Sequence, residues 1–195
     1  KPPLGKIDVT IAPSNPQRMY ALIQTRDQGS VWRTDDGGGG GNWKVVSWDR
    51  NLIMRAGYYI FIEANPKDAD GVLVLNSGDH YSSDGGLTFS GEGGKNVKPL
   101  GAASCGDCHD GWIDPTDPKH YVLTDDGGAN IATGAGTSMH VALPNGQLYH
   151  VASDDQVPYW IYGNRQDDGG WRISSDLSQP SGNGLLPEDA FMPQG

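Results

Sequence analysis

Ser82-Ser83-Asp84-Gly85-Gly86-Leu87-Thr88-Phe89 is the stretch that decides how this chain folds. It reads S-x-D-x-G-x-T-[W/F], an aspartate and glycines followed by a threonine and an aromatic residue. The Asp84 carboxylate can accept backbone N–H bonds inside a tight turn, and glycine adopts positive φ without steric cost. Threonine and phenylalanine both favour β structure. The stretch therefore predicts a hairpin turn between two antiparallel strands.

The same turn recurs along the chain. Its aspartates are Asp36, Asp84, Asp126 and, in a fainter echo, Asp168. Successive members of this series are separated by 48, 42 and 42 residues. A spacing of this size is typical of a four-stranded propeller blade. We therefore interpret Asp36, Asp84 and Asp126 as structural turn residues that lie away from any functional site.

A proline-rich turn that leads into an apolar strand keeps step with these hairpins. It occurs at residues 12–22, 63–75 and 114–123. Proline presets φ, and Asn or Asp closes such a turn. The sequence thus predicts an all-β fold, a partial β-propeller of about four blades. We expect residues 1–176 to form one propeller domain with an incomplete ring, and residues 177–195 to form an irregular C-terminal segment.

The composition agrees with many short strands joined by turns. Only 36% of the 195 residues are hydrophobic, whereas 29 are glycine and 13 are proline. The net charge of −10, from 24 acidic and 14 basic residues, argues against nucleic acid as a partner. We expect no membrane span, because no apolar stretch is long enough for one.

Three blocks of the sequence resemble one protein family. They lie at residues 43–59, 109–130 and 149–167. In that order they are similar to bacterial secreted BNR/Asp-box repeat proteins, which are related to the sortilin propeller and are often labelled sialidase-like or glycosyl-hydrolase-like. The resemblance implies a β-propeller from an extracellular or periplasmic location.

The members of this family are much longer than 195 residues, so the resemblance implies a segment from the middle of a longer chain. An open arc of blades leaves unpaired strand edges. We expect the remaining blades to come from a missing part of the polypeptide or from another chain. Two stretches depart from the family pattern, the glycine run 37–41 and the tail from Gly169 onward.

Both cysteines lie in the sequence C-x-x-C-H, formed by residues 105–109. This spacing can attach a c-type haem through Cys105 and Cys108, with His109 as an axial ligand of the iron. The sixth ligand would then be one of His80, His120, His140, His150 and Met139. Because the family often has Gly-Asp-x-His-Asp here without cysteines, a disulfide in an exported protein is a second interpretation. Free thiols, or half of a metal site, are a third.

Glycoside hydrolysis needs two carboxylates on opposite sides of a cleft. The carboxylates that we considered are Asp49, Glu63, Asp79, Asp110, Asp114, Asp155 and Asp167. Their spacing singles out no pair, which leaves Asp110, Asp114 and Asp167 as weak catalytic candidates. Arg50, Arg55 and Arg165 lie in the family-like blocks, but no Tyr/Glu nucleophile pair of a sialidase accompanies them. We therefore lean towards a protein that is not an enzyme.

Other residues leave a binding function and a structural role as alternatives. His109 and Asp110 either form a site at one face of the propeller or hydrogen-bond neighbouring loops. Asp125 and Asp126 with Asn130, and likewise Asp154 with Asp155, either collect oxygen ligands for Ca²⁺ or form solvated turns. Aromatic residues either stack on a sugar or peptide, or pack between blades; they are Trp48, Tyr58, Tyr59, Trp112, Tyr149, Tyr159, Trp160 and Tyr162.

Three functions follow from these observations. The first is an extracellular propeller scaffold or binding module that recognises a peptide or glycan, or that assembles with copies of itself. The second is an electron-transfer protein that carries one c-type haem at Cys105, Cys108 and His109. The third is a glycosidase-like enzyme. We place the scaffold or binding module first, because the repeat is evident and no catalytic constellation accompanies it.

Overall fold

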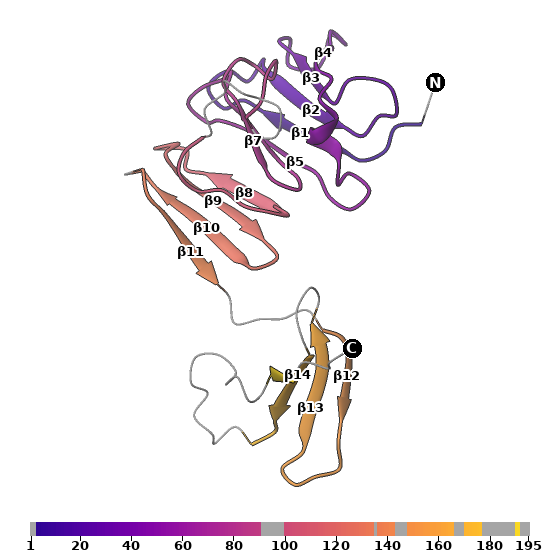
Figure 1. The fold of residues 1–195 in the computed structure, drawn as a ribbon. Helices are drawn as coiled ribbons and strands as arrows, with labels where there is room; N and C mark the ends of the chain where they lie inside the picture. Colours follow the sequence, from indigo (N-terminus) through magenta and orange to yellow (C-terminus); the bar gives the residue numbers. More distant parts are fainter. Residues whose placement is uncertain are drawn as a thin grey trace. The chain divides into compact units, whose positions relative to one another are not determined.

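The chain consists of two compact units of antiparallel β-sheet. The computed structural model describes residues 3–90, 100–134, 136–142, 148–165, 170–176 and 190–191. The units are Lys1–Leu143 and Pro144–Gly195. The boundary between the two units falls inside residues 1–176, the range that we expected to form one propeller domain. In each sheet, neighbouring strands follow one another along the chain (Figure 1). The fold is therefore all-β, as the repeated turns predict.

The first unit holds three successive sheets. The first sheet contains β1 (Ile7–Ile11), β2 (Met19–Ile23), β3 (Val31–Thr34) and β4 (Lys44–Ser47), and a single 3-10 turn, η1 (Arg50–Ile53), follows it. The described strands of the second sheet are β5 (Phe61–Ala64), β6 (Val72–Leu75) and β7 (Asp79–Ser82). The third contains β8 (Asp110–Ile113), β9 (His120–Asp125), β10 (Gly128–Thr133) and β11 (Ser138–Ala142). Each sheet is one propeller blade.

The second sheet is covered on both faces, which explains the apolar run of β6. Val72 and Val74 contribute to a core that also contains Tyr20 and Leu22 of the first sheet. Leu73 and Leu75 contribute to a second core with residues of the third sheet, among them Ile113, Tyr121 and Leu123. Because side chains alternate across a strand, a strand buried on both faces must be apolar throughout. All four residues of β6 are accordingly buried.

The first strands of the three sheets lie side by side and are joined by side chains that bond to backbone. Asp8 Oδ2 of β1 accepts a hydrogen bond from Ile62 N of β5 at 2.8 Å. Thr10 Oγ1 accepts one from Ala64 N at 3.1 Å. The Glu63 carboxyl in turn accepts from Ile113 N of β8. Thr10 and Glu63 precede their proline turns by the same number of residues. The same kind of side chain-to-backbone hydrogen bond therefore links each blade to the next.

In the first two Asp-Gly-Gly turns the aspartate accepts the backbone hydrogen bonds that the sequence predicts; β3 and β4 flank the first turn, and β7 precedes the second. Asp84 Oδ1 accepts hydrogen bonds from Leu87 N at 3.0 Å and Thr88 N at 2.9 Å. Gly85 and Gly86 have φ of 75° and 84°, which a residue with a Cβ rarely adopts. Partial burial alone would raise the pKa of Asp84, but hydrogen bonds from Thr88 and Ser82 hold it below its ordinary value.

Asp36 repeats this arrangement in the first sheet. Its Oδ1 accepts from Gly38 N at 2.9 Å and from Thr34 Oγ1 at 2.6 Å. The Thr34 hydroxyl, with help from Asn42, lowers the pKa of Asp36. Both this turn and the Asp84 turn follow the third strand of their sheets.

The third turn departs from the prediction in two ways. Asp125, not Asp126, is the structural aspartate: its Oδ1 accepts from Gly127 N at 2.8 Å and Gly128 N at 2.9 Å, and Asn130 Nδ2 donates to its Oδ2 at 2.7 Å. The turn also joins β9 to β10, the second and third strands of its sheet. Residues 124–128 therefore have the same sequence as residues 34–38 but form a different hairpin. The Asp126 carboxylate does not bond within this turn and is available to other partners.

Replacing these two aspartates separately tests that correction. Asp125→Ala should lower the free energy of unfolding by about 1–2 kcal/mol, because two backbone N–H groups and an amide lose their acceptor. Asp126→Ala should change it by less than about 0.5 kcal/mol, as an exposed side chain usually does. Urea denaturation of both variants measures the difference. Equal losses, or a larger loss in Asp126→Ala, would restore the original assignment.

The second unit is one further sheet of the same kind. Its strands are β12 (Leu148–Ser153), β13 (Trp160–Arg165), β14 (Gly170–Ser174) and β15 (Ala190–Phe191). A proline turn again joins the first strand to the second, with Asp154 Oδ1 accepting from Trp160 N at 3.0 Å. The Asp168 echo lies outside the described residues, as does most of the segment 177–195; within that segment, β15 pairs with β14.

Candidate functional site

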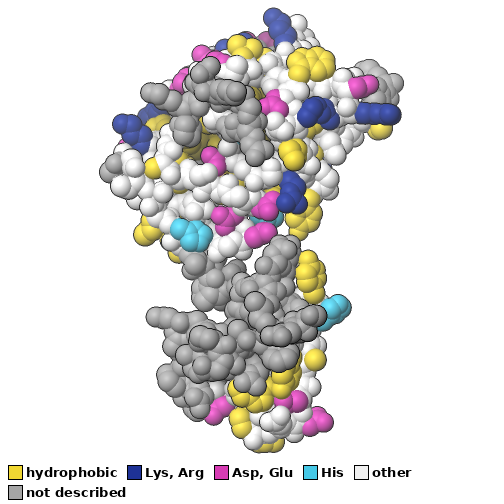
Figure 2. Space-filling view, in the orientation of Figure 1, with side chains coloured by type: hydrophobic (Ala, Val, Ile, Leu, Met, Phe, Trp, Pro, Cys, Tyr) yellow, Lys and Arg dark blue, Asp and Glu magenta, His cyan; other side chains and the backbone are white. Residues whose placement is uncertain are grey.

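The entry end of the first unit gathers the polar and aromatic residues that the sequence left open. By entry end we mean the end where the chain enters β5 and β8, at residues 48–60 and 100–109, together with the turns 76–78 and 125–128 between second and third strands. Because strands in a sheet alternate in direction, these segments lie at one end and the proline turns at the other. Figure 2 shows acidic, basic and hydrophobic side chains mixed on the visible face of this unit.

Asn76 joins two of the entry-end segments, although its side chain is fully buried. Its Nδ2 donates to Leu52 O at 2.9 Å, and its Oδ1 accepts from Arg55 N at 2.8 Å. Its backbone oxygen accepts from Cys108 N at 2.8 Å. One residue in the β6–β7 turn therefore fixes both the loop before β5 and the loop before β8.

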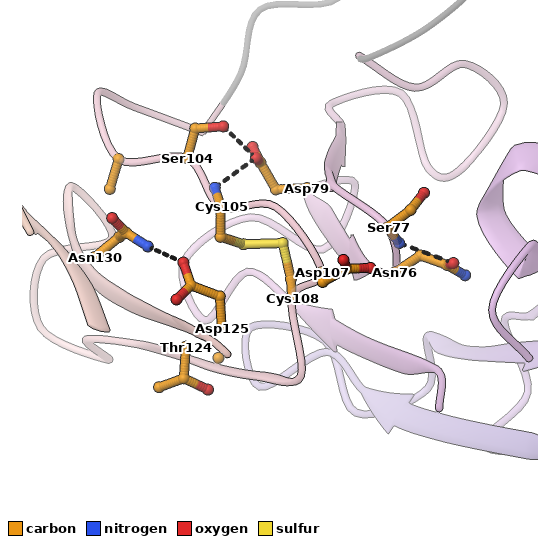
Figure 3. The surroundings of a disulfide bond; sticks show 12 residues. Asn76, Ser77, Asp79, Ser104, Cys105, Asp107, Cys108, Thr124, Asp125 and Asn130 are labelled. Carbon is orange, nitrogen blue, oxygen red and sulfur yellow. Dashed lines mark hydrogen bonds between the residues drawn. A yellow bond between two sulfur atoms is a disulfide. The ribbon is translucent and has the colours of Figure 1, made fainter. Parts of the chain in front are cut away.

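The loop before β8 is closed by a disulfide between Cys105 and Cys108 (Figure 3). Cys108 has no exposed surface, and Cys105 is 9% exposed. Asp79 holds the start of this loop, since its Oδ1 accepts from Ser104 Oγ at 2.5 Å and Cys105 N at 3.1 Å. Between the cysteines, Asp107 has φ of 48°, a left-handed conformation that is uncommon for a residue with a side chain.

The Asp107 carboxylate contacts the other loop of the entry end. Its Oδ1 accepts from Tyr59 Oη at 3.1 Å and pairs with Arg55 Nη2 at 2.7 Å. Burial of the phenol, together with its hydrogen bond to Asp107, raises the pKa of Tyr59 to about 12. Tyr59 is therefore a neutral hydrogen-bond donor near pH 7 and is not suited to act as a base.

His109 completes the cluster. Its Nε2 lies 2.7 Å from Asp126 Oδ1, the carboxylate that the third turn does not use. Its ring lies 4.3 Å from the Tyr59 ring, and Tyr58 stands edge-on to it with ring centres 6.2 Å apart. We call Arg55, Tyr58, Tyr59, Asp107, His109 and Asp126 the entry-end cluster. It offers hydrogen-bond donors, acceptors and both signs of charge around an exposed aromatic ring.

The cysteine geometry selects among the three interpretations of C-x-x-C-H. The two sulfur atoms are bonded to each other, as the disulfide interpretation requires. Both cysteines are members of the second core. His109, the expected iron ligand, bonds to Asp126 and packs on Tyr59 instead. The residues present therefore do not fit a covalent haem.

The candidate catalytic carboxylates are not brought together as a pair. Asp110 begins β8 and Asp114 follows its end, so the length of the strand separates them. Asp114 belongs to the proline turn, where hydrogen bonds from Thr116 lower its pKa. Asp167 lies outside the described residues. Glu63 has a pKa raised to about 7 by burial, with Asp110 adding to the shift, yet its Oε2 has no exposed surface to meet a substrate.

The acidic turns, for which a Ca²⁺ site and a solvated turn were the alternatives, use their carboxylate oxygens as hydrogen-bond acceptors. Asp125 accepts three N–H donors, and Asp154 accepts from Gln156 N, Trp160 N and Tyr162 Oη. Within the described part of the chain, the ligand-type atoms that converge are those of Asp79, Cys105 and Cys108. Both sulfur atoms of that group are bonded to each other in the disulfide, so the group offers a metal ion one carboxylate.

Most aromatic residues that the sequence left open are on the surface rather than between blades. Those that are exposed are Trp48, Tyr58, Trp112, Tyr149, Tyr159 and Tyr162, whereas Tyr59 and Trp160 are half-buried. The sequence did not predict a role for Asn76, because asparagine is common in turns and no sequence pattern indicates that this one is buried.

The described residues include no helix long and apolar enough to cross a membrane.

No protein-family model and no curated protein matches this chain. Solved structures that resemble it include a GH74 enzyme from Niastella koreensis (16% identity, TM-score 0.45) and an ancestral GH74 enzyme (14%, 0.49). The alignments cover 85% and 86% of this chain but 22% of each enzyme. YCF48 from Cyanidioschyzon merolae is 16% identical with a TM-score of 0.46, over 97% of this chain and 55% of that one. The chain thus spans a minor part of these two enzymes.

Proposed function

We propose that the protein is a non-enzymatic binding module of β-propeller type, and that the entry-end cluster binds an extended peptide. The observation that carries this proposal is the convergence of Tyr58, Tyr59, Arg55 and His109 from two loops that different blades position. Tyrosine and arginine are enriched at protein interfaces, where they supply contact area and directional hydrogen bonds. The disulfide favours an oxidising, extracellular or periplasmic location.

A peptide suits the cluster better than a glycan does. Tyr59 is already covered by His109, so Tyr58, 68% exposed, supplies the free ring. One free ring is a small platform for sugar stacking. A peptide instead uses donors, acceptors and both charges, which Arg55, Asp107 and Asp126 supply.

Selection of peptides from a displayed library, with an array of glycans in parallel, tests this function. Tyr58→Ala should weaken the selected peptide at least tenfold, whereas Tyr159→Ala, an exposed tyrosine of the second unit, should change the affinity less than about twofold. Binding that survives Tyr58→Ala would place the site elsewhere. Binding to glycans alone would replace the peptide as the ligand.

A second proposal concerns the first sheet, whose outer face is apolar and is left uncovered by the described residues of its own unit. Ile7, Val9 and Ile11 of β1 are 51%, 57% and 52% exposed, and they pair with Ile23, Ala21 and Met19 of β2. We propose that this face packs against another propeller blade, from a further part of the polypeptide or from another chain. In the second sheet, both faces are covered by neighbouring sheets in this way.

Self-association of the protein tests whether that apolar face packs against another surface. Val9→Lys should lower the tendency of the protein to associate at high concentration, because it places a charge in the apolar patch. Val157→Lys, at a position 98% exposed in the second unit, is the matched control and should change nothing. Sedimentation velocity over a range of concentrations records both. Equal association of Val9→Lys and the unmodified protein would remove this face from consideration.

A further inference from the structure

We infer that the entry-end cluster is under redox control: the disulfide form holds Asp107 against Tyr59 and Arg55, and reduction to the dithiol releases it. The inference rests on the proposed function only in calling the cluster a binding surface. The arrangement itself rests on the loop 105–108 and on the residues that this loop presents.

The disulfide explains why Asp107 keeps its conformation. Its φ of 48° is in the left-handed region, which residues with a Cβ avoid unless neighbouring structure enforces it. The bond between Cys105 and Cys108 closes the loop around Asp107. Hydrogen bonds from Asp107 N to Ser77 O at 3.0 Å and from Cys108 N to Asn76 O at 2.8 Å attach this closed loop to the β6–β7 turn.

The same loop carries both residues that contact the Arg55–Tyr59 segment. Asp107 bonds Tyr59 and Arg55, and His109, directly after Cys108, packs on the Tyr59 ring. The described hydrogen bond of the Tyr59 hydroxyl and the described ion pair of the Arg55 guanidinium both end on Asp107 Oδ1. Opening the loop therefore acts on Tyr59 through two residues at once.

Reduction is a two-electron exchange with a dithiol. A thiolate of the dithiol attacks Sγ of Cys105, the more exposed of the two cysteines, and Cys108 leaves as a thiolate. The second thiol of the reductant then attacks the mixed disulfide, which frees Cys105. The reductant leaves as a cyclic disulfide, and both cysteines take up protons. Asp107 can then adopt a negative φ, and its carboxylate moves away from Tyr59.

The ring protons of His109 report this change without any ligand. A stacked ring at 4.3 Å shifts the imidazole proton resonances upfield, so their NMR shifts measure the contact between Tyr59 and His109. Dithiothreitol is the reductant, and an intact-mass gain of two hydrogen atoms proves that reduction has occurred. We expect the His109 resonances to move towards the unstacked position, while those of His120, at the opposite end of its sheet, stay in place.

Two substitutions of Asp107 separate its side chain from its backbone. Asp107→Gly accepts the positive φ without strain, so the loop keeps its shape but lacks the carboxylate. It should move the His109 resonances as reduction does, without loss of stability. Asp107→Asn retains an oxygen that can accept from Tyr59 and should keep most of the upfield shift.

Unchanged His109 resonances in the reduced protein, or in Asp107→Gly, would overturn the inference. Binding of the selected peptide to the oxidised and reduced protein is an independent test, in which reduction should weaken binding at least tenfold. Equal peptide affinity in both redox forms would also overturn redox control, while leaving the proposed function in place. If no peptide is selected, the proposed function fails and the ring resonances still decide whether the disulfide arranges the cluster.

Discussion

Replacing Asn76 with alanine should lower the free energy of unfolding by about 3 kcal/mol, the largest single effect that we expect from a polar residue in this chain. The side chain is fully buried, and its removal leaves Leu52 O, Arg55 N and Ser77 N without their partners. Each buried group left unpaired costs about 1–3 kcal/mol. The melting temperature should fall by about 6–12 °C.

Thermal unfolding followed by circular dichroism measures this change. Asp27→Ala, at an exposed position, is the control and should alter stability by less than about 0.5 kcal/mol. Asn76→Ala should also broaden or shift the NMR resonances of the Arg55–Tyr59 segment, because Arg55 N loses its acceptor. A loss no larger than that of Asp27→Ala would show that Asn76 does not hold the two loops.

Glu63→Gln should stabilise the protein at alkaline pH and have little effect in acid. Burial raises the pKa of Glu63 to about 7, from an ordinary value of 4.5, and the nearby Asp110 contributes to the shift. An acid whose pKa is higher in the folded state binds its proton more tightly there. Its contribution to stability is therefore complete below pH 4.5, falls as pH rises through 7, and is absent above it.

The size of this effect follows from the shift after allowance for partial solvation. The full shift corresponds to about 3 kcal/mol, and screening by solvent reduces it to about 1.5 kcal/mol. Urea denaturation at pH 4.5 and pH 8 should therefore show Glu63→Gln more stable than the unmodified protein by about 1.5 kcal/mol at pH 8 only. Asp27→Asn, on the exposed surface, is the control. A difference that does not change with pH would contradict the raised pKa.

The blade structure was largely predictable, because the turn chemistry that specifies it is local. In every described sheet the proline turn joins the first strand to the second, from Pro13 to Pro158. The Asp-Gly-Gly turns predicted the order of the strands less reliably. Residues 34–38 and 124–128 share the letters T-D-D-G-G, yet one turn follows a third strand and the other a second. Local residue types set the conformation of a turn but not its position in the sheet.

The entry-end cluster was only partly predictable, because its members meet through tertiary packing. Tyr59 and Asp107 are 48 residues apart, and neither lies in one of the recurring turns that the sequence displays. The sequence singled out Cys105, Cys108 and His109 but left three chemistries open; in the structure the two sulfur atoms are bonded to each other. Glu63 was one carboxylate among several in the sequence; the contact between the first strands of two sheets brings its carboxyl to the backbone of β8.

Hydrogen–deuterium exchange with and without the selected peptide tests the central claim, that this propeller module binds its ligand at the entry end. We predict that the peptide slows exchange in residues 55–59, 105–109 and 125–128, which come from three separate parts of the sequence. The proline turns, at the opposite end of the same sheets, should exchange at unchanged rates. Protection of the proline turns instead, with residues 55–59 and 105–109 unaffected, would contradict the account.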